Sequence, residues 1–232
     1  MALIFYAQSA YSFTWQPTQL QYALMPDYCK ARMSHHFNNR QGKWRNRFPV
    51  NEAQIKYWHE KVGADFMHMH HYCAGLGWLM QAETPSYTRR NWAYRQAEEE
   101  IAYTIGRSVA TSPIWVEMNI AQAKAKAGLR KQKEAISQLS QLQSQYPKSP
   151  DIYVAMAQIL NRTGKTEDAI TILENGMDKT SKKGPLLFYL ARYYYDIGDV
   201  RMANELLPIA EAQGMKMDGL RKLLGTKKNT QE

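Results

Sequence analysis

The sequence lacks a run of about 18 apolar residues, the length that a membrane-spanning helix needs. It also lacks the HExxH, CxxC and CxxCH motifs and any glycine-rich phosphate loop. These absences argue against the common zinc-hydrolase, thiol-redox, haem and nucleotide-binding classes. The acidic residues 98–100 form one run within a predicted helix rather than two facing carboxylates. We therefore expect a protein that is not an enzyme and that carries no cofactor.

Cysteine is scarce, with only Cys29 and Cys73 among 232 residues. An even pair is typical of a disulfide in an exported protein, whereas a cytosolic protein more often keeps two buried thiols. Segment 1–12 contains a short apolar run followed by small residues, as in a secretory signal, although no Lys or Arg precedes the run. We expect a disulfide and a periplasmic or envelope-associated location; a cytoplasmic location is the alternative.

Positive charge dominates, since 30 Lys and Arg stand against 21 Asp and Glu, for a net charge of +9. This balance favours acidic partners such as nucleic acid, anionic lipid or an acidic protein surface. The basic residues are dispersed in small groups, which is typical of solvated helix faces. Nucleic acid is therefore not favoured, although a basic module that binds nucleic acid or an anionic membrane surface is kept as an alternative function.

Small residues recur at a fixed interval in the second half of the chain. Ala135, Ala169 and Ala203 are 34 residues apart, and Gly164 and Gly198 have the same spacing. This period predicts antiparallel helical hairpins, in which the alanines permit close crossings and the glycines end the first helices in a left-handed conformation. Other positions fit the same scheme: Ala157 and Ala191 within the first helices, and Leu139, Leu173 and Leu207 within the second helices.

These positions resemble the tetratricopeptide repeat, with three repeats in residues 113–214. The resemblance implies an all-α fold in which hairpins stack into a right-handed solenoid behind a helical, partly irregular N-terminal cap. It also implies a groove, lined by the first helices, that binds a peptide or a partner subunit. In the first repeat Gly128 lies seven residues before its alanine instead of five, which predicts a two-residue insertion or a longer first helix. Pro208 predicts a kink or a lost hydrogen bond in the last repeat.

Apolar spacing in the N-terminal region, 13–110, predicts helices at 27–33, 51–62, 64–83 and 85–107. The last two would form a hairpin of repeat size, a degenerate repeat at 64–108 stacked on the array. Residues 215–232 are expected to form a capping helix at 217–225 and a polar tail.

The PDYC and HHYC motifs at 26–29 and 70–73, together with the downstream repeats, are similar to those of a class of bacterial repeat proteins. That similarity supplies no mechanism.

Residues on the exposed faces of the first helices are the candidates for lining the predicted groove. Helical spacing places Tyr194 toward the core and leaves Tyr189, Arg192 and Tyr193 toward the groove. Its cations would suit a partner with carboxylates. The full set of candidate groove residues is Asn119, Lys126, Tyr153, Gln158, Arg162, Tyr189, Arg192 and Tyr193. We therefore predict a non-enzymatic scaffold for protein–protein interaction, within a larger and envelope-associated assembly.

A histidine-rich segment ending in Cys73 offers a second hypothesis. His68, His70 and His71 lie at helical spacing near this cysteine, and imidazole and thiolate suit zinc or copper. A thiol–imidazole pair for nucleophilic catalysis can be written from the same residues. If Cys73 is bridged to Cys29, no thiolate remains, and the histidines pack beside a disulfide. A metal-binding or redox protein that uses His68–Cys73 is thus an alternative function.

Overall fold

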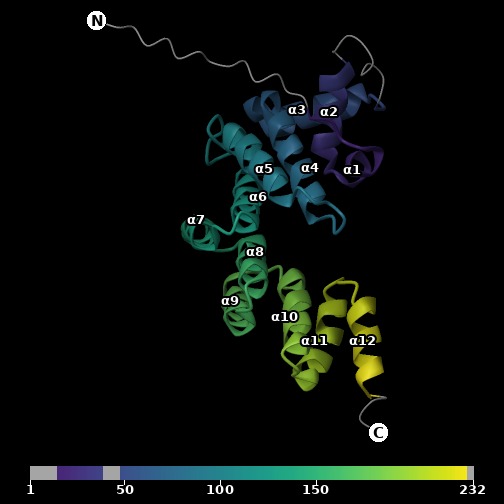
Figure 1. Cartoon of the computed structure of the whole chain (residues 1–232), viewed down its shortest axis with the longest axis vertical. Coiled ribbons are helices and arrows are strands. Elements are labelled where there is room, and N and C mark those ends of the chain that lie inside the picture. The colour runs from purple at the N-terminus through teal and green to yellow at the C-terminus, as the bar shows by residue number, and fades with distance from the viewer. Residues whose placement is uncertain (1–14, 39–47, 229–232) are drawn as a thin grey trace, which may run out of the picture.

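The computed structural model describes residues 15–38 and 48–228, and all regular secondary structure in this part of the chain is helical. The predicted all-α class is confirmed. Successive helices pack in pairs, and the pairs follow one another from the N-terminal block (residues 15–38 and 48–67) at the top of Figure 1 to the last helix (Asp218–Lys228) near the C-terminus. The apolar segment predicted at 1–12 and the end of the polar tail lie outside the described residues.

Twelve α-helices and one short 3-10 helix make up this part of the fold. The N-terminal elements are α1 (Gln19–Leu24), α2 (Asp27–Asn38), α3 (Glu52–Val62), the 3-10 helix η1 (Gly63–Met67), α4 (Met69–Glu83) and α5 (Arg90–Ile105). The later elements are α6 (Trp115–Gly128), α7 (Gln132–Gln145), α8 (Pro150–Asn161), α9 (Thr166–Lys179), α10 (Gly184–Asp196), α11 (Val200–Ala212) and α12 (Asp218–Lys228).

Three hairpins, α6–α7, α8–α9 and α10–α11, form the second half of the chain at the predicted spacing. Ala135, Ala169 and Ala203 are completely buried near the starts of the second helices. Each apolar cluster joins both helices of one hairpin to the first helix of the next element, and α12 closes the last cluster. No hairpin therefore buries its apolar surface alone, which is the packing rule of stacked repeats.

The α4–α5 hairpin joins this array by the same contacts. α5 packs against α6, and α4 also contacts α6, just as α7 and α6 contact α8 in the next unit. The helix predicted at 64–83 is divided, because the carbonyl of Asp65 accepts from the amide of His68 three residues on, which makes the first turns 3-10. α4 ends at Glu83, directly before the predicted break at Thr84–Pro85, but α5 begins only at Arg90 instead of at residue 85.

The N-terminal block contains one helix that was not predicted. α1 is only six residues long, yet Thr18 and Gln21 form a capping box, in which each side chain receives a hydrogen bond from the other residue's backbone. α2 extends to Asn38, beyond the predicted end at 33. α3 begins after the predicted cap, where the amide of Gln54 donates to the Asn51 side chain at 3.1 Å.

Of the two alternatives predicted for the first repeat, an insertion or a longer first helix, the structure shows the longer helix, because α6 has 14 residues whereas α8 and α10 have 12 and 13. Arg130, with φ of 64°, occupies the left-handed position that Gly164 and Gly198 occupy in the next two repeats, five residues before the buried alanine. Gly128 serves a different purpose, because a Cβ atom there would lie only 2.4 Å from the Tyr94 ring. Gly128 therefore permits close packing of α6 on α5 and is not the left-handed residue that ends the helix.

The C-terminal part of the array contains a helix with an internal proline and a final helix that covers the last hairpin. α11 continues through Pro208 to Ala212, so the proline is accommodated within the helix. The predicted capping helix is α12, whose Met217, Leu220 and Leu224 side chains are buried against the last hairpin.

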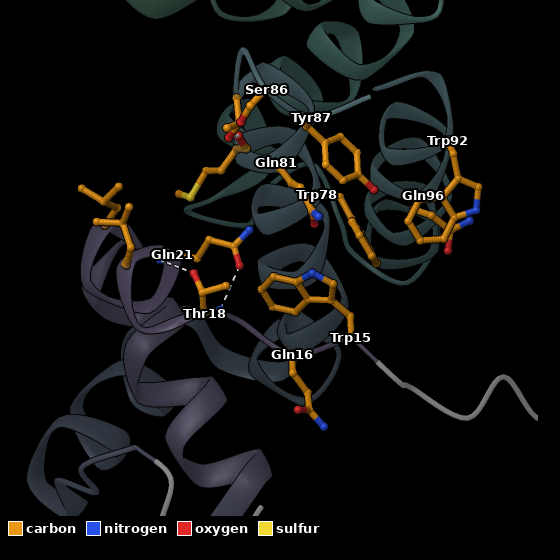
Figure 2. Close-up of a pocket in the computed structure, with 14 residues that line it drawn as sticks. Trp15, Gln16, Thr18, Gln21, Trp78, Gln81, Ser86, Tyr87, Trp92 and Gln96 are labelled. Carbon is orange, nitrogen blue, oxygen red and sulfur yellow. Dashed lines mark hydrogen bonds between the residues drawn. The ribbon is translucent and has the colours of Figure 1, made fainter. Parts of the chain in front are cut away.

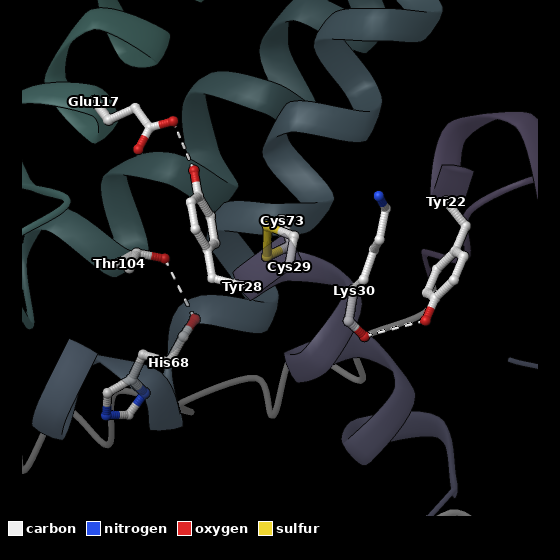
Figure 3. Close-up of a disulfide and its surroundings, with 8 residues drawn as sticks. All are labelled: Tyr22, Tyr28, Cys29, Lys30, His68, Cys73, Thr104 and Glu117. Carbon is white, nitrogen blue, oxygen red and sulfur yellow. Dashed lines mark hydrogen bonds between the residues drawn. A yellow bond between two sulfur atoms is a disulfide. The ribbon is translucent and has the colours of Figure 1, made fainter. Parts of the chain in front are cut away.

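A disulfide and a tyrosine fasten the N-terminal block to the array (Figure 3). The sulfur atoms of Cys29 and Cys73 lie 1.99 Å apart and join α2 to α4, with both residues completely buried. The hydroxyl of Tyr28 donates to Glu117 of α6 at 2.7 Å. Burial raises the pKa of Tyr28 and of Glu117. α2 is therefore linked to α4 covalently and to α6 by a half-buried polar contact.

We predict that Arg130→Gly stabilises the chain. A non-glycine residue in the left-handed region costs about 1–2 kcal/mol, of which glycine recovers roughly half after its own entropic cost. The midpoint of urea denaturation should therefore rise. Gly164→Ala at the equivalent position is the matched control and should lower it; a lower midpoint for Arg130→Gly would contradict the assignment.

Reduction of the disulfide should destabilise the chain. The two cysteines are separated by 44 residues, and closing a loop of this length contributes on the order of 4 kcal/mol by chain entropy. Urea denaturation with and without reductant measures the loss. The double variant Cys29→Ala/Cys73→Ala should be insensitive to reductant, and equal midpoints for the wild-type chain under both conditions would count against the bond.

Candidate interaction groove

First helices of successive hairpins border one cavity of about 390 Å³, which we call the central hollow. Its lining comes from α4, α6, α8 and α10, and from the residue that ends α8. The lining residues are Leu79, Glu83, Lys124, Gln158, Ile159, Asn161, Arg162 and Tyr193. The hollow therefore spans four units that are distant in sequence and lies where the repeat pattern predicts a groove.

An ion pair lies at the edge of the central hollow. The guanidinium of Arg162 donates to Glu83, 79 residues away in sequence, and links the end of α8 to the end of α4. The hydroxyl of Tyr94 donates to the other carboxylate oxygen at 2.7 Å. Both carboxylate oxygens of Glu83 thus have donors within the chain.

The charges in the central hollow influence one another. Burial raises the pKa of Glu83, but hydrogen bonds from Arg162 and Tyr94 outweigh it, and the net pKa is lowered. Burial lowers the pKa of Lys124, and the nearby Arg162 cation acts in the same direction. No hydrogen bond or ion pair to the Lys124 ammonium is found within residues 15–38 and 48–228.

A second cavity of about 290 Å³, the edge hollow, adjoins the first and shares Ile159 and Arg162 with it. It lies between the start of α5 and the turn from α6 to α7. Arg90 and Arg130 add two further cations to its lining. Together the two hollows present four basic side chains and one acidic one, so their surface is cationic.

The structure brings together only part of the predicted groove set. Gln158, Arg162 and Tyr193 line the central hollow, although Tyr193 is largely buried. Beside it, the Gln158 amide donates to the hydroxyl of Tyr189. Arg192 pairs with Asp196 at 3.0 Å on an exposed helix face.

Three predicted groove residues face the second helices instead. Asn119 is buried and accepts a hydrogen bond from Gln138 of α7 at 3.2 Å, and Lys126 donates to the same Gln138 at 2.8 Å. Tyr153 is buried against Gly176 of α9. The side chains of Asn119 and Tyr153 are thus buried and do not line the central hollow, and Lys126 is directed toward α7.

Lys124 lines the central hollow but was not among the predicted groove residues, although the 34-residue period indicates its position. Lys124, Gln158 and Arg192 are each 34 residues apart, so they occupy equivalent places on three first helices. Applying the period to Gln158 would have selected Lys124 in place of Lys126. Glu83 and Leu79 had no such signal, because α4 precedes the recognisable repeats.

The histidine-rich segment packs beside the disulfide. Nδ1 of His70 lies 3.1 Å from the Arg32 guanidinium, and burial lowers the pKa of His70 to about 2. Nδ1 of His71 lies 2.5 Å from Glu100, and the His68 carbonyl accepts from Thr104. Cys73 has no thiol in this structure. Over the described ranges no group of three His, Cys, Asp or Glu side chains gathers in a metal-binding arrangement.

Comparison of the chain with protein-family models, with curated proteins and with solved structures finds no match. None of the helices in the described part of the chain is long and apolar enough to cross a membrane. The class of protein that the fold and the site define is all-helical, with helices packed in successive pairs and a cationic hollow between them.

We predict that Arg162→Gln raises the pKa of Glu83, because burial is then opposed mainly by Tyr94. Carbon-detected NMR of the glutamate carboxyl groups measures this pKa. In the wild-type chain the lowered pKa means that the pair stabilises the fold above the ordinary glutamate pKa and loses this contribution as pH falls through the lowered value. Lys165→Gln, an exposed change beyond the hollow, is the control; an unchanged pKa in Arg162→Gln would contradict the pairing.

Proposed function

We propose that this chain is a non-enzymatic scaffold that binds an acidic peptide segment of a partner protein in the central and edge hollows. The observation that carries the proposal is the charge of this surface, because four basic side chains and one carboxylate line the two hollows. Lys124 is the main contact for a partner carboxylate, because its half-buried ammonium makes no hydrogen bond or ion pair within the described residues, and the nearby Glu83 and Asp151 carboxylates only partly offset the lowering of its pKa by burial. Pairing with a carboxylate would offset the cost of its burial.

We further propose that the array is a tetratricopeptide-like solenoid, with α4–α5 as a degenerate first unit. Three features support this proposal: the 34-residue period of buried alanines, the left-handed residue five positions before each, and a cavity bordered by first helices. The contacts of α4 and α5 with α6 follow those of the later hairpins. A groove assembled from several units can hold an extended segment, because each unit supplies one or two contacts along its length.

An envelope location is part of the proposal. The Cys29–Cys73 pair lies at bonding distance, which is compatible with an oxidising compartment. In such a compartment the N-terminal block stays attached to α4, one wall of the central hollow. The scaffold would then be one subunit of a larger envelope-associated assembly.

Direct binding of short synthetic peptides tests this function. We expect a fluorescent peptide of alternating Glu and Leu to bind, and a Lys and Leu peptide of equal length not to bind. Lys124→Gln should weaken binding of the acidic peptide about tenfold, the loss of one charge-assisted hydrogen bond. Fluorescence anisotropy measures both, and binding should weaken as salt is raised.

The matched control is Lys182→Gln, which removes the same charge from the exposed connection between α9 and α10. It should leave the affinity nearly unchanged. Equal losses in the two variants would show that only net charge matters, and the groove proposal would fail. Equal binding of the acidic and the basic peptide would also overturn it.

A further inference from the structure

A second region of the structure, across α4 from the central hollow, contains a cavity of different chemistry. It has a volume of about 750 Å³ and lies between α1, the end of α4 and the start of α5 (Figure 2). We call it the tryptophan pocket, after Trp15, Trp78 and Trp92 in its wall. Its size is within the range of small-molecule binding sites. This pocket takes no part in the proposed scaffold function.

The tryptophan rings are fixed by their neighbours. The Trp78 and Trp92 rings meet edge to face, with centroids 4.7 Å apart at 82°, and the Trp15 ring lies 6.2 Å from Trp78. Trp15 also packs so closely on Gly77 that a Cβ atom there would lie 1.9 Å from the indole. The Arg89 guanidinium covers the Trp92 ring at 4.5 Å. The half-buried Trp78 therefore remains as the central aromatic surface of the pocket.

The opposite wall comes from α1 and is held in place by hydrogen bonds. Gln21 caps α1 and its amide also donates to the carbonyl of Gly77 at 3.1 Å, which ties α1 to α4. Leu20 and Leu24 on this wall are 69% and 63% exposed, so no part of the described chain covers them. The pocket is thus preformed and open.

The pocket is neutral although the chain is strongly basic. None of the 14 lining residues is charged, and half of them carry an amide or an aliphatic hydroxyl. The side chains of Gln81, Ser86 and Tyr87 make no hydrogen bond to any other residue that the structure describes. Amides and hydroxyls both donate and accept, so these three groups can pair with a ligand of either character.

We infer that the tryptophan pocket binds a neutral oligosaccharide. A sugar ring has an apolar face of C–H groups, which carry partial positive charge and fit the electron-rich face of an indole. Its hydroxyls donate and accept at once, as do the amide and hydroxyls of Gln81, Ser86 and Tyr87. An uncharged ligand also suits a pocket whose lining residues include no Lys or Arg, in a chain of net charge +9 where the nearby Arg89 is stacked on Trp92.

Two other ligands fit less well. A proline-rich segment docks on aromatic grooves, but its backbone offers almost only acceptors, so the amide oxygen of Gln81 would lose water without gaining a donor. A lipid chain or another purely apolar ligand would leave every amide and hydroxyl of the pocket unsatisfied, at a cost for each buried group. The density of groups that both donate and accept therefore favours a polyhydroxylated ligand.

Calorimetric titration of the full chain with neutral tetrasaccharides tests the inference. The probes are β-1,4-linked glucose, β-1,4-linked N-acetylglucosamine and α-1,4-linked glucose tetramers, with decaproline for comparison. We expect at least one tetrasaccharide to bind with an affinity that is insensitive to salt, because no charge is involved. Gln81→Ala should weaken that binding about tenfold, by loss of its hydrogen bonds.

Gln81 and Ser86 are suitable positions because neither side chain makes a hydrogen bond to another described residue, whereas Trp78 packs on Trp15 and Trp92 and its replacement would disturb them. Gln145→Ala, an equivalent truncation on exposed α7, is the matched control and should bind as the wild-type chain does. No binding of any tetrasaccharide at a ligand concentration of about 10 mM, which would exclude a dissociation constant of about 1 mM or tighter, would overturn the inference. So would binding that Gln81→Ala and Ser86→Ala leave unchanged, or binding of decaproline alone.

Discussion

Close contact between helices at small side chains is the constraint on which the rest of this structure depends. Ala123, Ala157 and Ala191 are completely buried at equivalent places on three first helices, and larger side chains there would push the hairpins apart. Because each apolar cluster is shared between neighbouring units, the spacing of one hairpin fixes that of the next. The central hollow follows from this spacing, since it is the space that four first helices leave between their side chains.

The N-terminal block has no such period and depends on specific links. The Cys29–Cys73 bond joins α2 to α4, and Tyr28 reaches Glu117 on α6. Around these links the packing is largely aromatic; the Tyr22 and Phe48 rings, for example, stack at 4.2 Å. Short helices contribute little stability of their own, so long-range links of this kind hold them in place. The block in turn supplies α1 and thus one wall of the tryptophan pocket.

The sequence predicted the parts of the fold that repeat and failed where a position departs from the repeat or where distant segments meet. The hairpins, the capping helix and the cysteine pair followed from spacing and residue type. Arg130 was not recognised as a left-handed residue because glycine is the usual signal there, and Lys124 was missed because the period was not applied to it. The tryptophan pocket joins residues 15–24 to 78–96, and no local pattern links these segments.

The last turns of α4 separate the two candidate sites. Leu79 and Glu83, one turn apart, face the cationic central hollow, whereas Trp78 and Gln81 face the neutral tryptophan pocket. Charged side chains therefore line one side of α4 and uncharged side chains line the other. An acidic partner gains from the field of Lys124 and Arg162 and is weakened by salt, while an uncharged ligand across the helix experiences neither effect. Salt dependence therefore distinguishes a ligand of the central hollow from a ligand of the tryptophan pocket.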